Sequence, residues 1–377
     1  MRKIKYLIFP VGLSLVFATA LGAAWTTKRL TNNVGLSRDP AIAVDGSYVY
    51  AVWSDDTTGN KEIYFRKSVD GGVTWQSAKR ITNNTGVSHG PTIAVNGTDI
   101  CVAWYDSTPG NNEIYFMKST DRGSNWMSPH RITDNANDSL LPAIAISAAN
   151  VYIVWQDLTP GNWEIFFKRS IDGGSTWQSA KRLTNTSADS LWPAITVFGS
   201  KIYLAWYSNT TGNDEIYLQK SLDGGTTWQS AKRLTNNAGD SFAPTVAVNG
   251  ANIYMAWSDS TPGNSQIYFR KSTNGGASWQ SAKRLSNTTG KSINPAIAVK
   301  DEKVYIVWSD STSGDLEIYF IRSADGGATW KTAQRFTNNS GNSQSPSIAV
   351  SATKIYVLWD NYTSGNEEIY LKYSPVL

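Results

Sequence analysis

One eight-residue stretch recurs along the chain at a fixed interval. It reads Ser-Ile-Asp-Gly-Gly-Ser-Thr-Trp at Ser170–Trp177, and its six copies begin 51 residues apart, at positions 68, 119, 170, 221, 272 and 323. A constant period of this length indicates a repeat architecture, in which each unit buries its apolar surface against its neighbours. The period therefore constrains the fold more strongly than any local pattern does.

The repeated stretch has the composition of a tight turn between two strands. Gly173 and Gly174 supply the positive φ angles that other residues resist. The carboxylate of Asp172 is suited to accept hydrogen bonds from nearby backbone N–H groups and from the Thr176 hydroxyl. We expect Trp177 to leave the turn and pack beneath it, where its indole N–H needs an acceptor. Nothing in this stretch requires catalysis.

Each unit contains four strand-like runs, which in the second unit cover residues 77–82, 92–95, 100–105 and 113–118. The chain holds 16 Trp, 18 Tyr and 11 Phe together with 30 Gly, a composition that favours β-structure. No long segment beyond the N-terminus has the apolar spacing of a helix. An all-β fold with few helices is therefore expected.

The number of units follows from a Trp that closes one run in each of them. This Trp appears seven times although only six turns are complete, at Trp53, Trp104, Trp155, Trp206, Trp257, Trp308 and Trp359. The segment from Trp25 matches the residues after a turn, and the chain stops at Ser374–Leu377, where a seventh turn would begin. The N-terminal strand should thus complete the last unit and remove exposed sheet edges. We predict one domain, residues 25–377, folded as a seven-bladed β-propeller of four-stranded blades.

The pattern Ser-x-Asp-x-Gly-x-Thr-Trp resembles the Asp-box, or bacterial neuraminidase repeat, of the sialidase-like propeller superfamily. The resemblance covers essentially the whole chain after residue 24, with departures at Asn125 and Asn274. It implies that the boxes join the third and fourth strands on one face, and that ligands bind on the opposite face. It specifies the fold rather than an activity. The residues it assigns to a structural role are Asp70, Asp121, Asp172, Asp223, Asn274 and Asp325.

The N-terminus has the features of an export signal. Arg2, Lys3 and Lys5 precede an apolar run that ends in small residues near position 24, as in a cleaved signal peptide. An uncleaved membrane anchor is the alternative, because the run approaches the length of a spanning helix. We expect residues 1–24 to be removed, which gives a secreted or cell-surface protein, a monomer without stable membrane insertion.

The charge argues against nucleic-acid binding, and the cysteine content excludes an intramolecular disulfide. The formal net charge is +4, of which the leader contributes three, so the rest of the chain is close to neutral and has no basic surface typical of nucleic-acid binding. Cys101 is the single cysteine and cannot form an intramolecular disulfide. Its place within a strand-like run predicts a small buried apolar residue.

Two loop families should lie on the face opposite the boxes. The first begins with a carboxylate in five units, at Asp55, Asp106, Asp157, Asp259 and Asp310, with Ser208 and Asn361 at the equivalent places. These carboxylates could form a ring that binds a cation or sugars. Since the residue recurs in nearly every unit, we favour the simpler interpretation that each Asp starts a hairpin turn.

The second loop family breaks the symmetry of the repeat. A Ser is followed three residues later by a Pro in all seven units, and the two residues between them vary: Arg38-Asp39, His89-Gly90, Leu140-Leu141, Leu191-Trp192, Phe242-Ala243, Ile293-Asn294 and Gln344-Ser345. These pairs precede the innermost strands and should line the central mouth, with polar groups on one side and apolar groups on the other. Aromatic faces can stack on sugar rings while polar groups orient them. The candidate ligand-binding residues are Arg38, Asp39, His89, Leu140, Trp163, Trp192, Phe242, Asn294 and Gln344. The alternative is that the apolar members plug the channel and His89 is incidental.

Sialidase activity is not expected. The resemblance places Arg38 where the family has its first substrate-binding arginine, which would hold a carboxylate bidentately. The family also uses two further arginines, a Tyr–Glu nucleophile pair and an acidic Asp, and none of these has a counterpart here. Its sialidases also usually have six blades.

Other glycosidic chemistry would need a second carboxylate near Asp39. Asp138, Asp189 and Asp240 are available, but each precedes the repeated Ser of its unit and is better explained as a loop cap. The sequence contains no metal-ligand cluster, phosphate-binding loop or nucleophile motif. It assigns no catalytic residue, metal or cofactor.

These observations favour an exported recognition or scaffold propeller that binds a glycan or another cell-envelope component on the loop face. A polysaccharide hydrolase or lyase is the first alternative, and it predicts polymer turnover that depends on Asp39. A module for protein–protein interaction in the envelope is the second, and it predicts capture of a protein partner.

Overall fold

The computed structural model describes residues 24–362 and 365–376. The expected leader, residues 1–24, lies outside this part of the chain apart from Ala24, so its cleavage stays a prediction. Every regular element among the described residues is a strand. Accordingly, this part of the chain offers no helix long and apolar enough to span a membrane.

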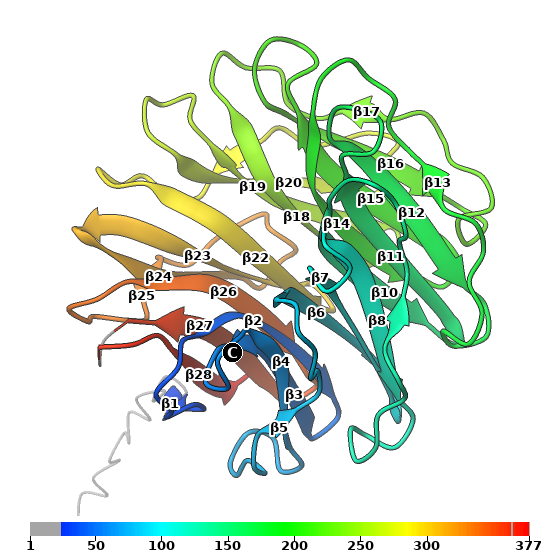
Figure 1. Ribbon diagram of the computed structural model, residues 1–377. Coiled ribbons are helices and arrows are strands. Elements are labelled where there is room, and N and C mark those ends of the chain that lie inside the picture. The colour runs from blue at the N-terminus through cyan, green and yellow to red at the C-terminus, as the bar shows by residue number, and fades with distance from the viewer. Residues whose placement is uncertain (1–23, 363–364, 377) are drawn as a thin grey trace, which may run out of the picture.

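The strands form seven antiparallel four-stranded sheets arranged radially around a central axis (Figure 1), which confirms the predicted seven-bladed propeller. The inner strands are β2 (Ser37–Asp45), β6 (Ser88–Asn96), β10 (Ser139–Ser147), β14 (Ser190–Phe198), β18 (Ser241–Asn249), β22 (Ser292–Lys300) and β26 (Ser343–Val350). The second strands are β3 (Tyr48–Asp55), β7 (Asp99–Asp106), β11 (Asn150–Asp157), β15 (Lys201–Ser208), β19 (Asn252–Asp259), β23 (Lys303–Ser313) and β27 (Lys354–Asn361).

The outer half of each blade is less uniform in length. The third strands are β4 (Glu62–Ser68), β8 (Glu113–Ser119), β12 (Glu164–Ser170), β16 (Glu215–Ser221), β20 (Gln266–Ser272), β24 (Asp315–Ser323) and β28 (Glu368–Pro375). The outer strands are β1 (Thr26–Arg29), β5 (Lys79–Arg80), β9 (His130–Arg131), β13 (Lys181–Arg182), β17 (Lys232–Arg233), β21 (Lys283–Arg284) and β25 (Gln334–Arg335). Such short outer strands offer little edge for pairing with another chain.

Two strand boundaries differ from the sequence-based expectation. In the second blade the inner strand starts at Ser88 instead of residue 92, because a bulge between His89 and Thr92 lets pairing continue past Pro91. The run predicted at residues 77–82 covers only Lys79–Arg80 and forms the outer strand of the preceding blade. The variable pairs therefore belong to the inner strands themselves.

The ring closes as predicted. β1 pairs antiparallel with β28, from Thr26 opposite Tyr373 to Arg29 opposite Tyr370, and so supplies the outer strand of the blade that contains the C-terminus. Trp25 packs edge-on against Phe320 of the sixth blade, with ring centroids 5.2 Å apart. The two ends of the chain are thus held in one sheet.

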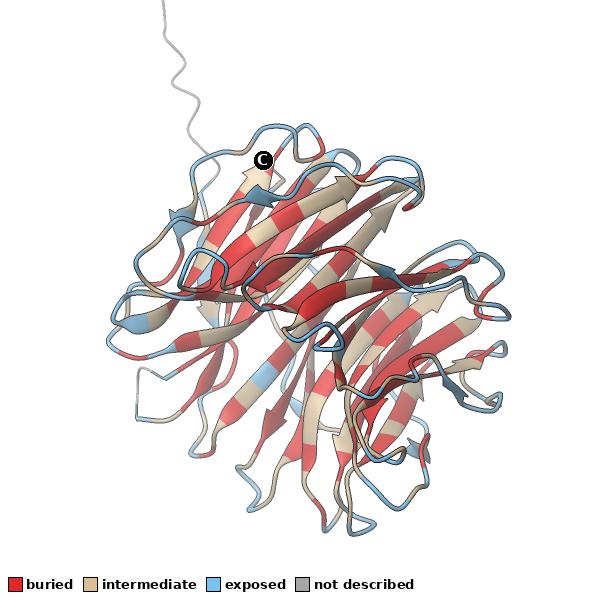
Figure 2. Ribbon diagram, turned by 90° about the horizontal axis from the view of Figure 1, so that it is seen from above, coloured by how far each residue is buried: buried red, intermediate tan, exposed pale blue. Residues whose placement is uncertain are grey.

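The hydrophobic core is divided among the contacts between adjacent blades. One cluster joins Tyr50 and Val52 of β3 to Ile100, Val102 and Trp104 of β7, and all five side chains are fully or almost fully buried. Figure 2 shows the same pattern around the ring, with buried positions along the strands and exposed ones in the turns. Cys101 is fully buried in the next of these clusters, which confirms its expected role, and burial raises its pKa to about 12.

The turn between the third and outer strands, which we call the acidic turn, has the expected internal hydrogen bonds. In the third blade the Thr176 hydroxyl and backbone N–H donate to Asp172 at 2.5 and 2.9 Å. The Ser170 hydroxyl donates to the same carboxylate at 2.7 Å and accepts from the Gly174 N–H at 2.8 Å. These bonds, led by the one from Thr176, hold the pKa of Asp172 well below its ordinary value.

The Trp of the acidic turn packs differently from the expectation. Trp177 lies edge-on against Phe116 of the preceding blade, with centroids 5.1 Å apart, so it connects two blades and does not only fill the space beneath its own turn. Its indole N–H is buried and has no acceptor, whereas the indole of Trp75 donates to the Gly72 carbonyl at 3.2 Å. Contact with the neighbouring blade thus outweighs the missing hydrogen bond.

The acidic turn yields a first prediction. Gly174 has φ of +92°, and a Cβ there would lie 2.5 Å from the Phe116 ring of the preceding blade. We expect Gly174→Ala to lower the free energy of unfolding by about 1–3 kcal/mol, because backbone strain and a displaced aromatic ring act together. Urea denaturation measures the effect. Gly199→Ala is the control: Gly199 also has positive φ, +61°, but open space around its Cβ position, so an equal loss in both variants would contradict the inter-blade contact.

Candidate functional site

The repeated carboxylates at the ends of the second strands are structural. Asp106 is fully buried, and its carboxylate accepts from the Ser88 hydroxyl at 2.6 Å, the Asn84 amide at 2.8 Å and the Thr108 N–H at 2.8 Å. It also accepts from the indole of Trp104 at 3.3 Å. This arrangement confirms that the recurring Asp starts a hairpin turn. It leaves no free ring of carboxylates in the first loop family.

The variable pairs are placed by a bulge that every inner strand contains. In each blade the second residue of the pair falls in the bulge and adopts a left-handed φ, from 49° to 55°: Asp39, Gly90, Leu141, Trp192, Ala243, Asn294 and Ser345. The fixed Ser before it stays in the ladder, and a Pro follows it. The bulge turns these side chains out of the sheet and towards the axis.

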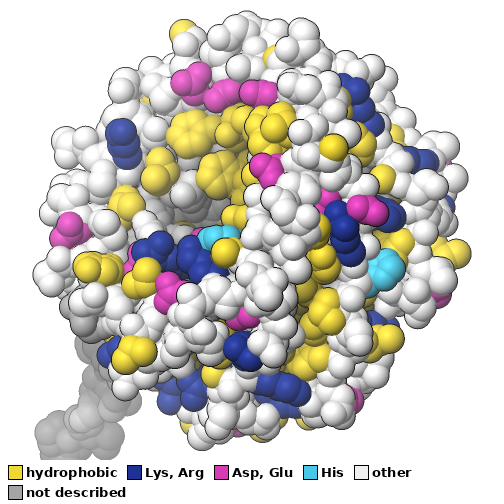
Figure 3. Space-filling view, viewed as in Figure 1, with side chains coloured by type: hydrophobic (Ala, Val, Ile, Leu, Met, Phe, Trp, Pro, Cys, Tyr) yellow, Lys and Arg dark blue, Asp and Glu magenta, His cyan; other side chains and the backbone are white. Residues whose placement is uncertain are grey.

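All seven bulge residues converge on one cavity of about 330 Å³ at the axis. Tyr105 and five of the prolines complete its wall. Figure 3 shows the hollow from outside, with hydrophobic side chains along one edge and Lys, Arg and His side chains along the opposite edge. An open, partly apolar cavity of this size is typical of a small-ligand site.

The structure separates the predicted site residues into two groups. Asp39, Trp192 and Asn294 line the cavity directly. The first members of the pairs are half-buried in the inner strands and are not among the residues that line this cavity: Arg38, His89, Leu140, Phe242 and Gln344. Their part in ligand binding stays a prediction.

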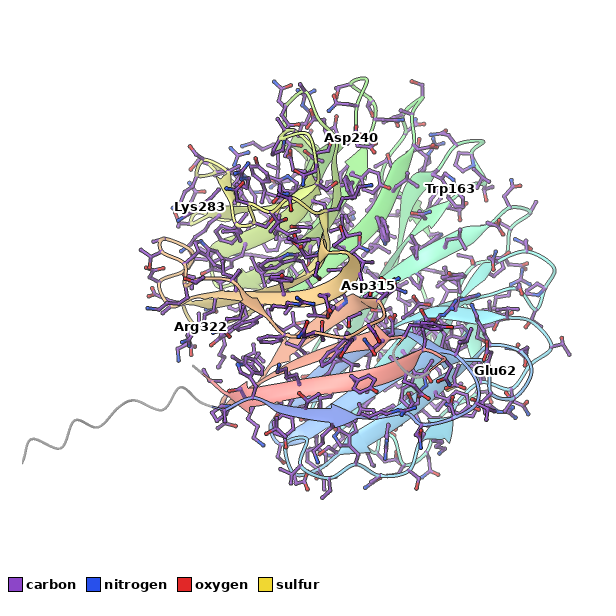
Figure 4. All side chains as sticks on the ribbon, turned by 90° about the vertical axis from the view of Figure 1, so that its left-hand side faces the viewer. Glu62, Trp163, Asp240, Lys283, Asp315 and Arg322 are labelled. Atoms are coloured by element: carbon purple, nitrogen blue, oxygen red, sulfur yellow. The ribbon has the colours of Figure 1, made fainter. Side chains whose placement is uncertain are left out.

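Trp163 is the remaining predicted site residue. It lies half-buried in the loop between β11 and β12 and is absent from the wall of the cavity. Its backbone N–H donates to Asp189 at 2.9 Å. In Figure 4 Trp163 and Glu62 lie towards one face of the ring, and Lys283 and Arg322 towards the other. Trp163 thus shares the face of the cavity but sits on a loop outside its wall.

The apolar side of the cavity is centred on Trp192. Its side chain is 41% exposed, unusual for a large aromatic residue, and its ring lies 6.5 Å from that of Tyr207. The Trp192 N–H donates to the Gln156 side chain of the preceding blade at 3.0 Å. Leu141 and Ala243 flank it in the adjoining blades. An exposed indole fixed in this way offers a rigid apolar face to a ligand.

The opposite side contains an ion pair. The guanidinium of Arg38 contacts the carboxylate of Glu367, a residue only 6% exposed, and the Gln344 amide donates to the same carboxylate at 3.3 Å. Arg38 is therefore already paired and not free to hold a substrate carboxylate. This arrangement removes the remaining likeness to a sialidase arginine.

His89 stacks on Tyr105 in the second blade, with ring centroids 5.5 Å apart and 12° between the planes. Burial, followed by the charge of Lys61, lowers the pKa of His89, so its imidazole is neutral at pH 7. The Tyr105 ring also lies close to the bulge of this blade, since a Cβ at Gly90 would lie 2.7 Å from it. Burial, followed by the charge of Asp39, raises the pKa of Tyr105 to about 12.

Asp360, on the second strand of the seventh blade, is the most unusual ionisable group near the cavity. It is 1% exposed, and neither of its carboxyl oxygens completes a hydrogen bond. Burial, followed by the nearby charge of Asp39, raises its pKa to about 7. It faces Gln344 across the strand pair. Sequence reasoning missed it, although its position holds neutral residues in the other six blades.

The carboxylates considered as partners of Asp39 have a different role. Asp138 accepts from the Asn112 N–H at 2.8 Å, and Asp189 and Asp240 accept from the equivalent N–H groups, each in the β-hairpin loop of the preceding blade. They cap the loops, as the simpler interpretation held. Asp214 lies beside two of them, and burial, followed by the charges of Asp240 and Asp189, raises its pKa. In the described part of the chain no group of three or more His, Cys, Asp or Glu side chains is arranged to hold a metal ion.

Comparison with known proteins finds solved structures of similar fold. No family model matches the chain. The fold is a seven-bladed β-propeller, and solved sialidases and a polysaccharide lyase have a similar fold. Polysaccharide lyase Uly1 superposes with a TM-score of 0.59 and 11% identity over 90% of both chains. The phage phi92 endosialidase gives 0.57 and 10% identity over 94% of this chain and 69% of its own.

Two further relatives match only part of their own length. Trypanosoma rangeli sialidase superposes with a TM-score of 0.56 and 13% identity, and the match covers 94% of this chain and 60% of that enzyme. In sequence, a protein TolB homolog of Chlorobaculum tepidum is 35% identical over 130 residues, which is 34% of this chain and 26% of that protein. At these identities the solved structures share a fold with this chain and nothing finer is shown.

Proposed function

We propose that this protein is an exported recognition propeller that binds a glycan in the central cavity. The main support for the proposal is that the cavity wall is apolar on one side and polar on the other, although seven equivalent bulges form it. Exposed Trp192 lies three blades from Asp39, so a stacking face and a polar face oppose each other across the axis. Sugars present an apolar ring face and a polar edge, which such a cavity can contact together.

Two further parts of the proposal concern the rest of the chain. Residues 1–24 act as a cleaved export signal, so the propeller works outside the cytoplasm as a single closed domain. The acidic turns are Asp-boxes with a structural role, in line with hydrogen bonds that stay within each turn. Solved propellers of similar fold act on glycans, as their names state, which supports a ligand of this class without identifying it.

The binding proposal predicts a loss of affinity in Trp192→Ala. Alanine suits the backbone, since Ala243 occupies the equivalent bulge with φ of 49° against 55° for Trp192. Removal of a stacking indole should weaken glycan binding about 10- to 30-fold, or about 1.4–2 kcal/mol. A glycan array that includes cell-wall polysaccharides identifies ligands, and titration calorimetry then measures their affinity.

The control for this experiment is Phe198→Ala. Phe198 is 48% exposed at the far end of the same strand β14, so it removes a surface aromatic ring without touching the cavity. Binding should stay at the wild-type value in this variant. If no glycan binds, or if binding survives Trp192→Ala unchanged, the proposed function is wrong. Turnover of a bound polymer would instead favour an enzyme.

A further inference from the structure

Asp360 occupies a position that is equivalent in all seven blades, the residue directly after the second-strand Trp. The structural role of this position needs no charged side chain. In the third and fifth blades the residue after the second-strand Trp accepts a hydrogen bond from the bulge of the next blade. Gln156 accepts the bulge N–H of Trp192 at 3.0 Å, and Ser258 accepts that of Asn294 at 3.2 Å. The residues at this position are Ser54, Tyr105, Gln156, Tyr207, Ser258, Ser309 and Asp360. A neutral acceptor therefore suffices, and the carboxyl group of the seventh blade calls for another explanation.

Asp360 lies directly behind two residues of the cavity wall. Its polar neighbours are the Asp39 N–H, the Ser345 hydroxyl and the Gln344 amide, and the first two of these residues line the cavity. Even so, neither carboxyl oxygen completes a hydrogen bond, although the side chain is 99% buried. An unpartnered buried carboxyl group is costly, so it is seldom present without a partner that arrives later.

The surrounding charges leave this edge of the cavity with excess negative charge. Asp39, Asp360 and Glu367 contribute three carboxyl groups, whereas Arg38 contributes one guanidinium that is already paired with Glu367. Another cation of this sector, Lys61 in the β3–β4 loop, lies where it lowers the pKa of His89. An incoming positive charge would be stabilised here by Asp39 at the wall and by Asp360 behind it.

The kind of cation follows from the number of oxygens available. Calcium takes six to eight oxygen ligands and usually several carboxylates at once. The described residues offer no group of acidic side chains arranged for a metal ion. A primary ammonium group needs only about three acceptors and is commonly held by one or two carboxylates. The edge thus suits an organic ammonium group better than a metal ion.

We propose that Asp39 and Asp360 form a subsite for the protonated amino group of an amino sugar, so that the cavity selects glycans with free amines. The inference rests on the proposed function and names its ligand class. Asp39 contacts the ammonium group directly. Asp360 acts through Asp39, as a positioning residue that adds negative charge behind it. Trp192, across the axis, stacks on the sugar ring.

Titration calorimetry with three tetrasaccharides tests this subsite. The probes are the β-1,4-linked tetramers of glucosamine, N-acetylglucosamine and glucose, measured at pH 7 and low salt, where the amine is partly protonated and Asp360, with a pKa of about 7, is partly ionised. The glucosamine tetramer should bind at least about tenfold more tightly than the other two, because charge-assisted hydrogen bonds are the strong ones. Added salt should reduce this preference.

Three variants test which carboxyl group causes the preference for the glucosamine tetramer. Asp39→Asn should abolish the amine preference while the neutral tetramers keep their affinity, and Asn294 shows that asparagine fits this φ. Asp360→Asn should reduce the preference severalfold, again without changing binding of the N-acetylated tetramer, which a merely structural role would not achieve. Asp301→Asn, in the β22–β23 hairpin on the opposite face, removes a largely exposed carboxylate as the control and should change nothing.

The outcomes separate this inference from the proposed function. Equal binding of all three tetramers, with loss in Trp192→Ala, would overturn the amine subsite and leave glycan binding in place. A preference that survives Asp39→Asn would place the amine elsewhere and overturn the subsite as well. Failure of all three tetramers to bind would refute the ligand class, and the glycan array then decides on the proposed function separately.

Discussion

Asp106→Ala is expected to destabilise the protein by about 3–5 kcal/mol. The substitution removes a buried carboxylate and leaves the Ser88 hydroxyl and the Trp104 indole without an acceptor. The pKa of Asp106 shows how well the charge is satisfied: burial alone would raise it, but the hydrogen bonds from Ser88 and Thr108 outweigh burial and hold it low. Few single side chains in this fold connect as many elements.

The measurement is urea denaturation followed by tryptophan fluorescence. Asp106→Asn should cost less than the alanine variant, because the seventh blade uses Asn361 at this position and that amide donates to the Ser343 hydroxyl at 2.6 Å. Asp315→Ala is the control, an exposed carboxylate at the start of β24. A loss below about 1 kcal/mol in Asp106→Ala would contradict the structural role of the first loop family.

Asp360→Asn is expected to change the pH dependence of stability. The pKa of Asp360 is about 7 in the folded protein, raised by burial and then by Asp39, against 3.8 for an ordinary Asp. Between pH 4 and pH 7 the folded state therefore keeps a proton that the unfolded state has lost. The wild type becomes less stable through this window as pH rises, by up to about 4 kcal/mol. The variant lacks this decline.

The comparison of variant with wild type isolates this one group. Asp39, which acts on the charge of Asp360, and the Arg38–Glu367 ion pair are present in both proteins. His89 has a lowered pKa, so its contribution rises with pH in part of the same window and cancels in the difference. The free energy of unfolding from urea titrations at pH 4, 6 and 8 gives the result. An equal pH profile for both proteins would show that Asp360 is ionised throughout.

The acidic turns act in a different pH range. Their carboxylates, such as Asp172, have pKa values held below the ordinary 3.8 by hydrogen bonds from the turn. Stability from these bonds is present above pH 4 and is lost only as pH falls below it. The turns lose their contribution only below pH 4, so a decline between pH 4 and pH 7 belongs to carboxyl groups with a raised pKa, Asp360 and Asp214, and the part that Asp360→Asn removes belongs to Asp360.

The sequence was sufficient for the fold because each blade repeats the same local chemistry. The period, the seven strand-closing tryptophans and the complementary chain ends specify the blade number and the closure through β1 and β28. It was also sufficient to locate the variable pairs at the central mouth. It did not reveal which member of each pair faces the cavity, because alternation along a strand is reversed by a bulge and the bulge has no sequence mark beyond the Pro after it.

Asp360 and Glu367 were missed for a related reason. Both lie in columns where the repeat tolerates variation, and their importance comes from contact with the first blade across the closure, far away in sequence. Arg38 shows the converse, since its sequence context suggested a free ligand-binding arginine. Its partner Glu367 lies 329 residues away and could be found only in three dimensions. Trp163 stood out because it is unique among the repeats, but its loop carries it outside the wall.

The left-handed bulges make the cavity wall a set of positions that can change one at a time. Each bulge residue lies between a paired Ser two residues before it and a Pro directly after it, and its backbone conformation is the same in every blade. Aspartate, leucine, tryptophan, alanine, asparagine and serine already occupy this conformation in this one chain. Gly90 lies against the Tyr105 ring, and Trp192 packs near Tyr207. The bulge positions can thus carry different side chains for a new ligand while the backbone of the ring stays as it is.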